Sequence, residues 1–168
     1  MRALLQHIDA FTSHCGRLLA WLALFMALVT TLVVFLRYGF NIGSIAAQEA
    51  VTYMHGSLFM LGAAFALKTG AHVRVDIFYR NFSPRAQAWV NSLGGILFLM
   101  PLCLFIFGIS INYVAESWAI RESSPEPGGI PAVFLLKTLL PLMAINLMLQ
   151  GMAEILRSSL LLIEGDNR

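Results

Sequence analysis

The sequence predicts an all-α integral membrane protein with four transmembrane helices, and three observations lead to this fold class. Hydrophobic residues make up 58% of the chain and charged residues only 12%, a balance outside the range of ordinary soluble domains. Four apolar stretches cover residues 18–36, 50–67, 90–114 and 132–151, each close to or above the roughly 20 residues that cross a hydrocarbon core. The polar segments between them are too short to fold alone. Residues 1–168 therefore form a single four-span membrane domain.

The residues before the first span carry an amphipathic pattern. Four apolar residues recur there at helical spacing: Leu4, Ile8, Phe11 and Cys15. Such a segment can lie at the membrane surface as an interfacial helix, with its apolar face toward the lipid. The same pattern also fits a first span that starts early, as one long tilted helix, because periodicity does not separate the two cases. Both interpretations stay open at this stage.

The distribution of Lys and Arg predicts the orientation of the chain. Eight of these residues flank the spans on the side of the two termini and the middle connection: Arg2, Arg17, Lys68, Arg74, Arg80, Arg85, Arg157 and Arg168. The connections on the opposite side hold Arg37 and Arg121. By the positive-inside rule, both termini and the middle connection are cytoplasmic. Because the net charge of +2 gathers in no basic patch, we expect contact with membrane lipids and none with nucleic acid.

Small residues within the spans predict close contact between helices. Gly62 and Ala66 are four residues apart in the second span, and Gly94 and Gly95 are adjacent in the third. Small side chains at such spacing let two helices approach closely in lipid. Packing within the four-helix domain is the simplest use of these positions, since the four helices must contact each other before they contact a partner.

Ionisable residues near the non-cytoplasmic ends of the spans form a predicted rim. Burial of charge in a membrane is costly, so such residues mark either an interface with water and headgroups or a functional contact. The rim consists of Arg37, Glu49, Glu116, Arg121, Glu122, Glu126 and Lys137. Each residue alone can simply be solvated at the interface, whereas together they offer a surface on which a soluble partner can dock.

The sequence offers no constellation of catalytic or metal-binding residues. It contains no phosphate-binding glycine loop, no H-E-x-x-H and no G-x-S-x-G. His55 is the one histidine well within a span, whereas a haem held by two histidines needs a second at a facing position. His72 and Asp76 are four residues apart, but the further ligands that a metal site needs are missing. We therefore expect no enzyme, no cofactor and no metal.

Several segments of the chain resemble one family of membrane subunits. They are Leu36-Arg37-Tyr38-Gly39-Phe40-Asn41, then Glu49, then Leu61-Gly62-Ala63-Ala64-Phe65-Ala66-Leu67-Lys68, then His72-Val73-Arg74-Val75-Asp76. In this order and spacing they resemble the small integral membrane subunit of tripartite ATP-independent periplasmic (TRAP) transporters. The resemblance continues through the turn at residues 128–131 into the fourth span. Members often carry Trp just before the acidic residue that opens the second span, where this chain has Gln48.

The resemblance implies a four-span subunit with both termini in the cytoplasm, in agreement with the charge distribution. It also implies a role in sodium-coupled uptake of organic acids across a bacterial or archaeal inner membrane. A periplasmic binding protein would deliver the substrate to a large multi-span subunit, which holds the substrate and sodium sites and which the small subunit scaffolds. The alternative from the residues is a membrane anchor subunit of a haem- or quinone-binding redox complex.

The resemblance and the residue pattern together assign candidate roles to three sets of residues. Contacts with the large subunit or the binding protein are predicted at Arg37, Tyr38, Asn41, Glu49, Glu116 and Lys137. Close helix packing is predicted at Gly62, Ala66, Gly94 and Gly95. Anchoring of the cytoplasmic connection against the lipid headgroups is predicted at Lys68, His72, Arg74 and Asp76.

Overall fold

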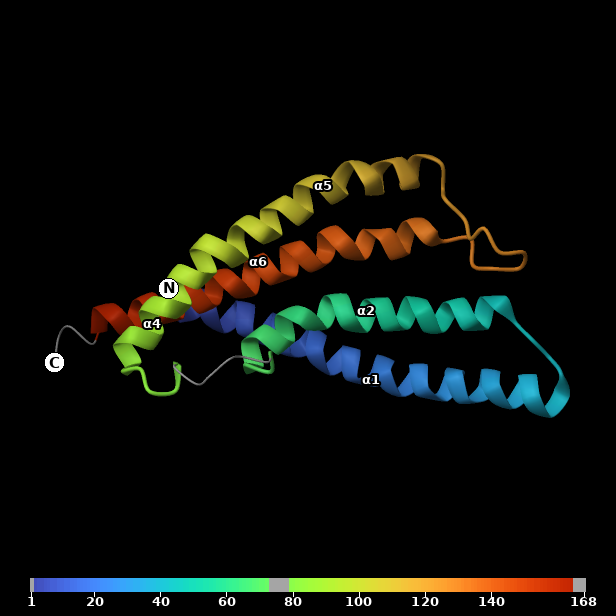
Figure 1. The fold of residues 1–168 in the computed structure, drawn as a ribbon, viewed down its shortest axis with the longest axis horizontal. Coiled ribbons are helices and arrows are strands. Elements are labelled where there is room, and N and C mark those ends of the chain that lie inside the picture. The colour runs from blue at the N-terminus through green and yellow to red at the C-terminus, as the bar shows by residue number, and fades with distance from the viewer. Residues whose placement is uncertain (1, 73–78, 165–168) are drawn as a thin grey trace.

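Long helices dominate the fold, which a computed structural model describes for residues 2–72 and 79–164. The elements are α1 (Arg2–Phe40), α2 (Ile45–Thr69), α4 (Pro84–Gly94), the π-helical turn η1 (Gly95–Leu99), α5 (Met100–Ala119) and α6 (Val133–Glu164) (Figure 1). Among these described residues, four stretches are long and apolar enough to cross a membrane: Ala3–Phe40, Ile45–Thr69, Pro84–Ala119 and Val133–Ile163. The predicted fold class, all-α with four transmembrane helices, is confirmed.

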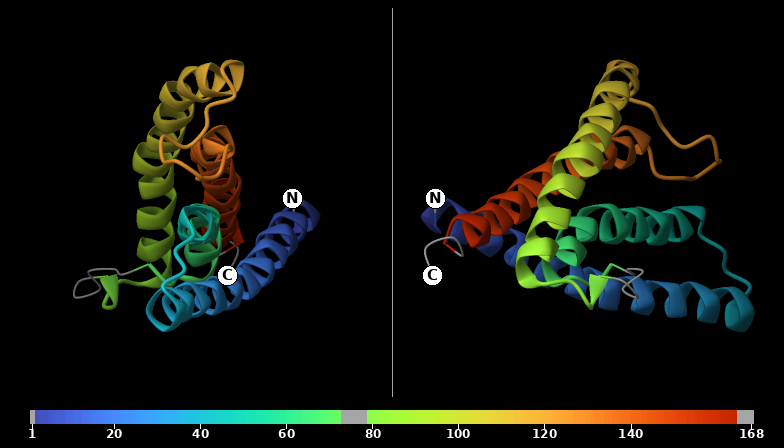
Figure 2. Two further views of the ribbon diagram at one scale, coloured as in Figure 1. Left: turned by 90° about the vertical axis from the view of Figure 1, so that its right-hand side faces the viewer. Right: turned by 60° about the vertical axis from the view of Figure 1, so that its left-hand side comes forward.

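The four spans form an open, curved layer. α1 packs mainly on α2, α2 on α6, and α6 on α5, so the order in space is α1, α2, α6, α5 (Figure 1). Viewed along the helices, α1 and α5 lie on either side of α2 and α6 (Figure 2). We call the end that holds residues 41–44 and 120–132 the loop end, and the end that holds the start of α1 and the end of α6 the terminal end.

Local sequence signals set the ends of the shorter helices. α2 begins after Ser44, whose hydroxyl accepts a hydrogen bond from the backbone N–H of Ala47. It ends at Gly70, which adopts a left-handed φ of 66° that costs glycine little. Ser83 caps α4 in the same way. Pro84 occupies the first helical position, where the backbone N–H has no partner within the helix, so its absence costs no hydrogen bond.

The third span contains a π-helical turn just before Pro101. Proline has no N–H to donate to the carbonyl four residues earlier. In the turn before it, the N–H of Met100 donates to the carbonyl of Gly95, five residues earlier, which is the hydrogen bond of a π-helix. A Cβ on Gly95 would lie 2.6 Å from Cγ1 of Ile155, and a Cβ on Gly151 would lie 2.6 Å from a side-chain atom of η1. Two glycines therefore allow the third and fourth spans to touch at this turn.

α1 is one continuous helix, so of the two interpretations of the N-terminal segment the structure has the long first helix. Its 39 residues extend about 58 Å at 1.5 Å per residue. Its buried side carries Leu5, Thr12 and Leu19, whereas Leu4 and Phe11 of the predicted apolar face are exposed. The buried face differs from the apolar face because polar residues of this segment bond to α6, as described below.

Many large apolar side chains of the described residues are exposed. On α1 alone the exposed ones include Trp21, Phe25, Leu28, Leu32 and Phe35. Many of the buried positions are small, among them Ala64, Ala144 and Ala153. Water would disfavour an apolar surface of this extent, whereas lipid accommodates it. The burial pattern therefore agrees with a layer of helices inserted in a membrane.

Candidate functional site

Glu49, near the start of α2, holds the connection between α5 and α6 in place. One carboxylate oxygen accepts a hydrogen bond from the backbone N–H of Ile130 at 2.6 Å, and the other accepts one from the hydroxyl of Ser124. The backbone N–H of Ser124 in turn donates to the carbonyl of Ile130 at 3.3 Å. Gly129 lies between them, where a Cβ would come within 2.5 Å of the Ser124 oxygen. We call this arrangement the Glu49 clamp.

A second cluster at the loop end joins α5, the connection and α6. Lys137 Nζ lies 2.5 Å from a carboxylate oxygen of Glu122, which also accepts a hydrogen bond from the Ser117 hydroxyl at 2.6 Å. The ammonium lies 4.1 Å from the centre of the Tyr113 ring, close enough for a cation–π interaction. The hydrogen bonds from Lys137 and Ser117 lower the pKa of Glu122. The carboxylate is therefore charged at neutral pH and neutralises Lys137.

The other predicted contact residues are exposed at the loop end. Arg37 and Tyr38 lie in the last turn of α1, and the Tyr38 side chain is the more prominent at 82% exposure. Asn41 follows the helix with a positive φ of 55°. Glu116 is exposed on α5. The structure thus divides the predicted set: Glu49 and Lys137 bond within the chain, and the side chains of the other four face outward.

A polar network at the terminal end joins α1 to α6. Gln150 is fully buried. It accepts a hydrogen bond from the Thr12 hydroxyl at 2.8 Å and donates to carboxylate oxygens of Asp9 at 3.4 Å and Glu154 at 3.2 Å. Arg157 donates to the same two carboxylates, at 2.7 Å to Asp9 and 2.5 Å to Glu154. A helix pair that would otherwise meet through apolar contacts is therefore joined by charge-assisted hydrogen bonds.

Lys68 extends this network to α2. Its ammonium donates to the backbone carbonyl of Asp9 at 2.6 Å and to the hydroxyl of Ser13 at 2.5 Å. His72 is exposed just beyond the end of α2. The other two members of the predicted cytoplasmic motif, Arg74 and Asp76, lie outside the described residues. Lys68 therefore braces α1 against α2, a contact that no local sequence pattern predicts.

The residues predicted for close packing differ in how near their neighbours lie. Gly95 makes the tight approach to α6 described above. A Cβ on Gly62 would lie 3.9 Å from Leu19, which is an ordinary contact, and a Cβ on Gly94 would meet nothing within 4 Å. Ala66 is half-buried. Gly16, which the sequence analysis did not single out, faces the Phe65 ring so closely that a side chain there would clash.

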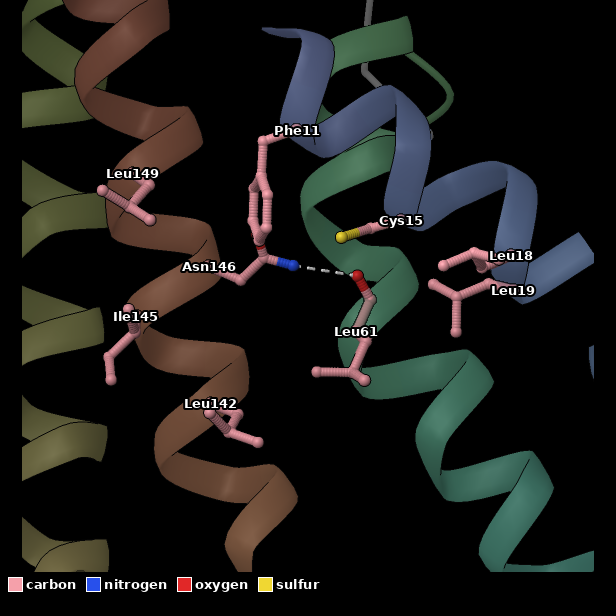
Figure 3. A pocket seen from close by; sticks show the side chains of 9 residues that line it. All are labelled: Phe11, Cys15, Leu18, Leu19, Leu61, Leu142, Ile145, Asn146 and Leu149. Atoms are coloured by element: carbon pink, nitrogen blue, oxygen red, sulfur yellow. Dashed lines mark hydrogen bonds between the residues drawn. The ribbon is translucent and has the colours of Figure 1, made fainter. Parts of the chain in front are cut away.

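An apolar cavity of about 290 Å³ lies between α1, α2 and α6 (Figure 3). It is lined by Phe11, Cys15, Leu18, Leu19, Leu61, Leu142, Ile145, Asn146 and Leu149. The amide nitrogen of Asn146 donates to the carbonyl of Leu61 at 3.2 Å, and the amide oxygen is buried without a partner. Such a lining suits an apolar chain, and apart from the Cys15 thiol it holds no nucleophile and no general base. In the part of the chain that the structure describes, no cluster of three or more His, Cys, Asp or Glu side chains is placed to hold a metal.

Comparison with known proteins identifies the family of this chain. The family model described as "Tripartite ATP-independent periplasmic transporters, DctQ component" matches residues 26–160, which include α2, the third span and most of α6. A protein of Haemophilus influenzae, whose name assigns it to the TRAP transporter small permeases, is 32% identical over 131 residues, 77% of this chain and 79% of that relative. No solved structure matches the chain. The chain belongs to the DctQ family, the small permease subunits of TRAP transporters.

Proposed function

We propose that this chain scaffolds the large membrane subunit of a TRAP transporter that takes up organic acids with sodium. The observation that carries the proposal is the open layer of four helices, with apolar outer faces on α1 and α6 and an apolar cavity between α1, α2 and α6. An apolar cavity does not suit a carboxylate substrate or a sodium ion. Substrate and ion sites then belong to another subunit, and this chain contributes a rigid surface beside it.

The charge distribution gives the proposed complex its orientation in the inner membrane of a bacterium or archaeon. The terminal end faces the cytoplasm, because it carries most of the Lys and Arg residues. The loop end then faces the periplasm and presents Arg37, Tyr38, Asn41 and Glu116 to the large subunit or the binding protein. Glu49 and Lys137 shape this surface through their bonds within the chain and need not touch the partner themselves.

The alternative, a haem- or quinone-binding redox anchor, draws no support from the site or the family. His55 is exposed on α2 beside Phe59, and the other three histidines lie toward the terminal end. The matching family is a transporter component. The transport proposal therefore stands alone.

Reconstitution of the complete transporter tests the proposal. The tagged chain is co-expressed with the large subunit, purified in mild detergent and placed in proteoliposomes with the binding protein outside. We expect the large subunit to co-purify in a fixed ratio and the vesicles to accumulate an organic acid when a sodium gradient is imposed. Failure of the large subunit to co-purify would contradict the scaffold role, and uptake that ignores the gradient would contradict sodium coupling.

Reversal of one charge at the loop end probes the proposed docking surface. Arg37→Glu is expected to lower the initial rate of uptake severalfold while the amount of chain in the membrane stays the same, because an exposed cation on that surface becomes an anion. Arg80→Glu, the same change at an exposed residue of the terminal end, serves as the control. Equal uptake by wild type and Arg37→Glu would remove Arg37 from the docking surface.

A further inference from the structure

One face of α2 is polar where the helix crosses the membrane. The exposed residues of the helix body are Ile45, Gln48, Thr52, His55 and Phe59. Steps of three and four residues place all five on a single stripe, which we call the α2 stripe. The Thr52 hydroxyl reaches its own helix, at 3.5 Å from the carbonyl of Gln48, and the His55 ring stacks on Phe59 with 6.5 Å between centroids.

His55 lies deep in the membrane. Ten residues separate it from Ile45, where α2 begins, which is about 15 Å along the axis and roughly half of a 30 Å hydrocarbon core. A neutral imidazole has one N–H donor and one acceptor nitrogen, and lipid can satisfy neither. Exposed polar groups at this depth are therefore expected to face protein or a water-filled space.

The exposed faces of α1 and α6, the helices on either side of α2, are less polar than the α2 stripe. The exposed face of α6 carries Leu135, Leu142, Ile145 and Met152, and the exposed middle of α1 is made mainly of large apolar side chains. Thr30 and Thr31 of α1 are exposed, but both hydroxyls donate to carbonyls of their own helix, at 2.7 and 2.9 Å. These two faces suit lipid. The α2 stripe adds an amide and an imidazole for which the described chain supplies no hydrogen bond.

The fold itself leaves the stripe uncovered. The opposite side of α2 is the side that packs within the chain: Leu61, about half a helical turn from the stripe in projection, accepts the hydrogen bond from Asn146 of α6. α1 and α6 both pack against α2, and the residues of the stripe stay exposed. No helix within residues 2–72 and 79–164 covers His55, so we expect its cover to come from a partner.

We propose that the α2 stripe docks a transmembrane helix of the large membrane subunit, and that this helix hydrogen-bonds to His55 and Gln48. The inference rests on the proposed function and adds to it the face by which the two subunits meet. The stripe is straight over about 21 Å of helix axis, which suits one helix lying alongside. Its polar groups are an amide, a hydroxyl and an imidazole, so the partner helix offers groups such as Ser, Thr or Asn. Phe59 supplies the apolar inner end of the contact.

Photo-crosslinking in the assembled transporter tests this face directly. Benzoylphenylalanine replaces Thr52 or Phe59 in the stripe, or Leu28 on the exposed face of α1 as a control, in complexes purified with the large subunit and placed in native lipid. We expect Thr52 and Phe59 to give an adduct with the summed mass of the two subunits and Leu28 to give none. An adduct between two copies of this chain, or with lipid alone, from an intact complex would overturn the proposal. A large subunit that fails to co-purify with the wild-type chain would overturn the proposed function as well, and this outcome is seen before any probe is introduced.

Substitution of His55 separates a docking role from a structural one. His55→Leu is expected to reduce severalfold the amount of large subunit retained through a stringent detergent wash, whereas His55→Gln, which keeps a donor and an acceptor, retains it. Trp21→Leu, on the exposed face of α1, is the control. The melting temperature of the isolated chain stays the same in all three variants, because both positions are exposed. Retention unchanged by His55→Leu, or a loss that tracks a lower melting temperature of the isolated chain, would contradict the proposal.

Discussion

The polar contacts at the two ends of the molecule join different parts of the chain. At the terminal end, hydrogen bonds join residues far apart in the sequence: Thr12 and Gln150 are 138 residues apart, and Asp9 and Arg157 are 148 apart. At the loop end, Lys137 lies 15 residues from Glu122, and the Glu49 clamp attaches the connection between α5 and α6, at residues 75 and 81 positions away, to α2. The terminal end therefore fixes how the helices are arranged, and the loop end fixes the shape of a surface.

This difference ranks the expected effects of mutation. Gln150 and Thr12 are almost completely buried, so a lost partner there leaves polar groups that water cannot reach. The groups of the loop end are partly accessible, and solvent can replace a lost bond. Changes at the terminal end should therefore lower the stability of the whole chain, whereas changes at the loop end should loosen one connection.

The largest effect is expected for Gln150→Leu. The substitution removes the donor and acceptor that link Thr12, Asp9 and Glu154, at a cost of about 2–3 kcal/mol for buried polar groups left without a partner. Unfolding of the purified chain in mild detergent, followed by circular dichroism, measures the loss. Gln48→Leu, the same change at an exposed position of α2, should leave the isolated chain unaffected. Equal stability of both variants would mean that the network does not hold α1 to α6.

A smaller loss of stability is expected for Lys68→Met. The ammonium bonds to the Asp9 carbonyl and the Ser13 hydroxyl, and removal of a part-buried pair of this kind costs about 1 kcal/mol. The same unfolding measurement applies. Arg17→Met removes a cation from an exposed position of the same end and is the control. A loss as large for Arg17→Met would point to a general effect of charge instead of the brace between α1 and α2.

At the loop end, Glu49→Gln should act on the connection alone. The glutamine amide keeps one acceptor oxygen but has an NH₂ group in place of the second. One of the two donors, the Ile130 N–H or the Ser124 hydroxyl, then has no acceptor, so one of the two clamp bonds is lost. Hydrogen exchange of the Ile130 amide, which donates to Glu49, should speed up severalfold while the unfolding midpoint changes little. Glu116→Gln, at an exposed carboxylate of the same end, is the control. A large drop in the unfolding midpoint would erase the contrast between the two ends.

The smallest expected effect depends on pH. Hydrogen bonds from Lys137 and Ser117 lower the pKa of Glu122 below its ordinary value of 4.5. A lowered carboxylate pKa stabilises the fold above 4.5, and this contribution disappears as the pH falls through the lowered value. Fluorescence of Trp118, measured in a variant with Trp21 and Trp89 replaced by Phe, should therefore stay constant from pH 7 to about 4.5 and change below it. Glu122→Gln should abolish the change, and a transition that persists in that variant would assign it to another group.

The sequence was sufficient for features that depend on neighbouring residues. Four apolar stretches of the right length predicted four spans, and the helices extend past the predicted limits at both ends of the first three spans and at the C-terminal end of the fourth. α1 and α6 extend furthest past the predicted limits, because hydropathy counts Asp9 and Arg157 as separate charges, whereas in the fold they neutralise each other. No local pattern reveals such a pair, since its members come together only when α1 and α6 are placed side by side.

The candidate site shows the same division. The sequence indicated a rim of charged residues near one end, and the structure shows which of them pair: Lys137 with Glu122, and Glu49 with a backbone N–H. The second kind of contact could not be predicted, because it depends on the path of residues 120–132. The α2 stripe could have been found from helical spacing once α2 was placed between two neighbours, but the sequence alone does not show which side those neighbours cover.

The length of α1 has a consequence for the membrane around it. A helix of about 58 Å is nearly twice as long as a hydrocarbon core of about 30 Å is thick, so it must incline steeply or carry its first turns along the headgroups. Each ångström of mismatch costs a fraction of a kcal/mol. Because Asp9 and Lys68 tie those first turns to the other helices, α1 cannot change its inclination freely when the bilayer thins or thickens. The length of the lipid acyl chains therefore affects how the protein is placed in the membrane.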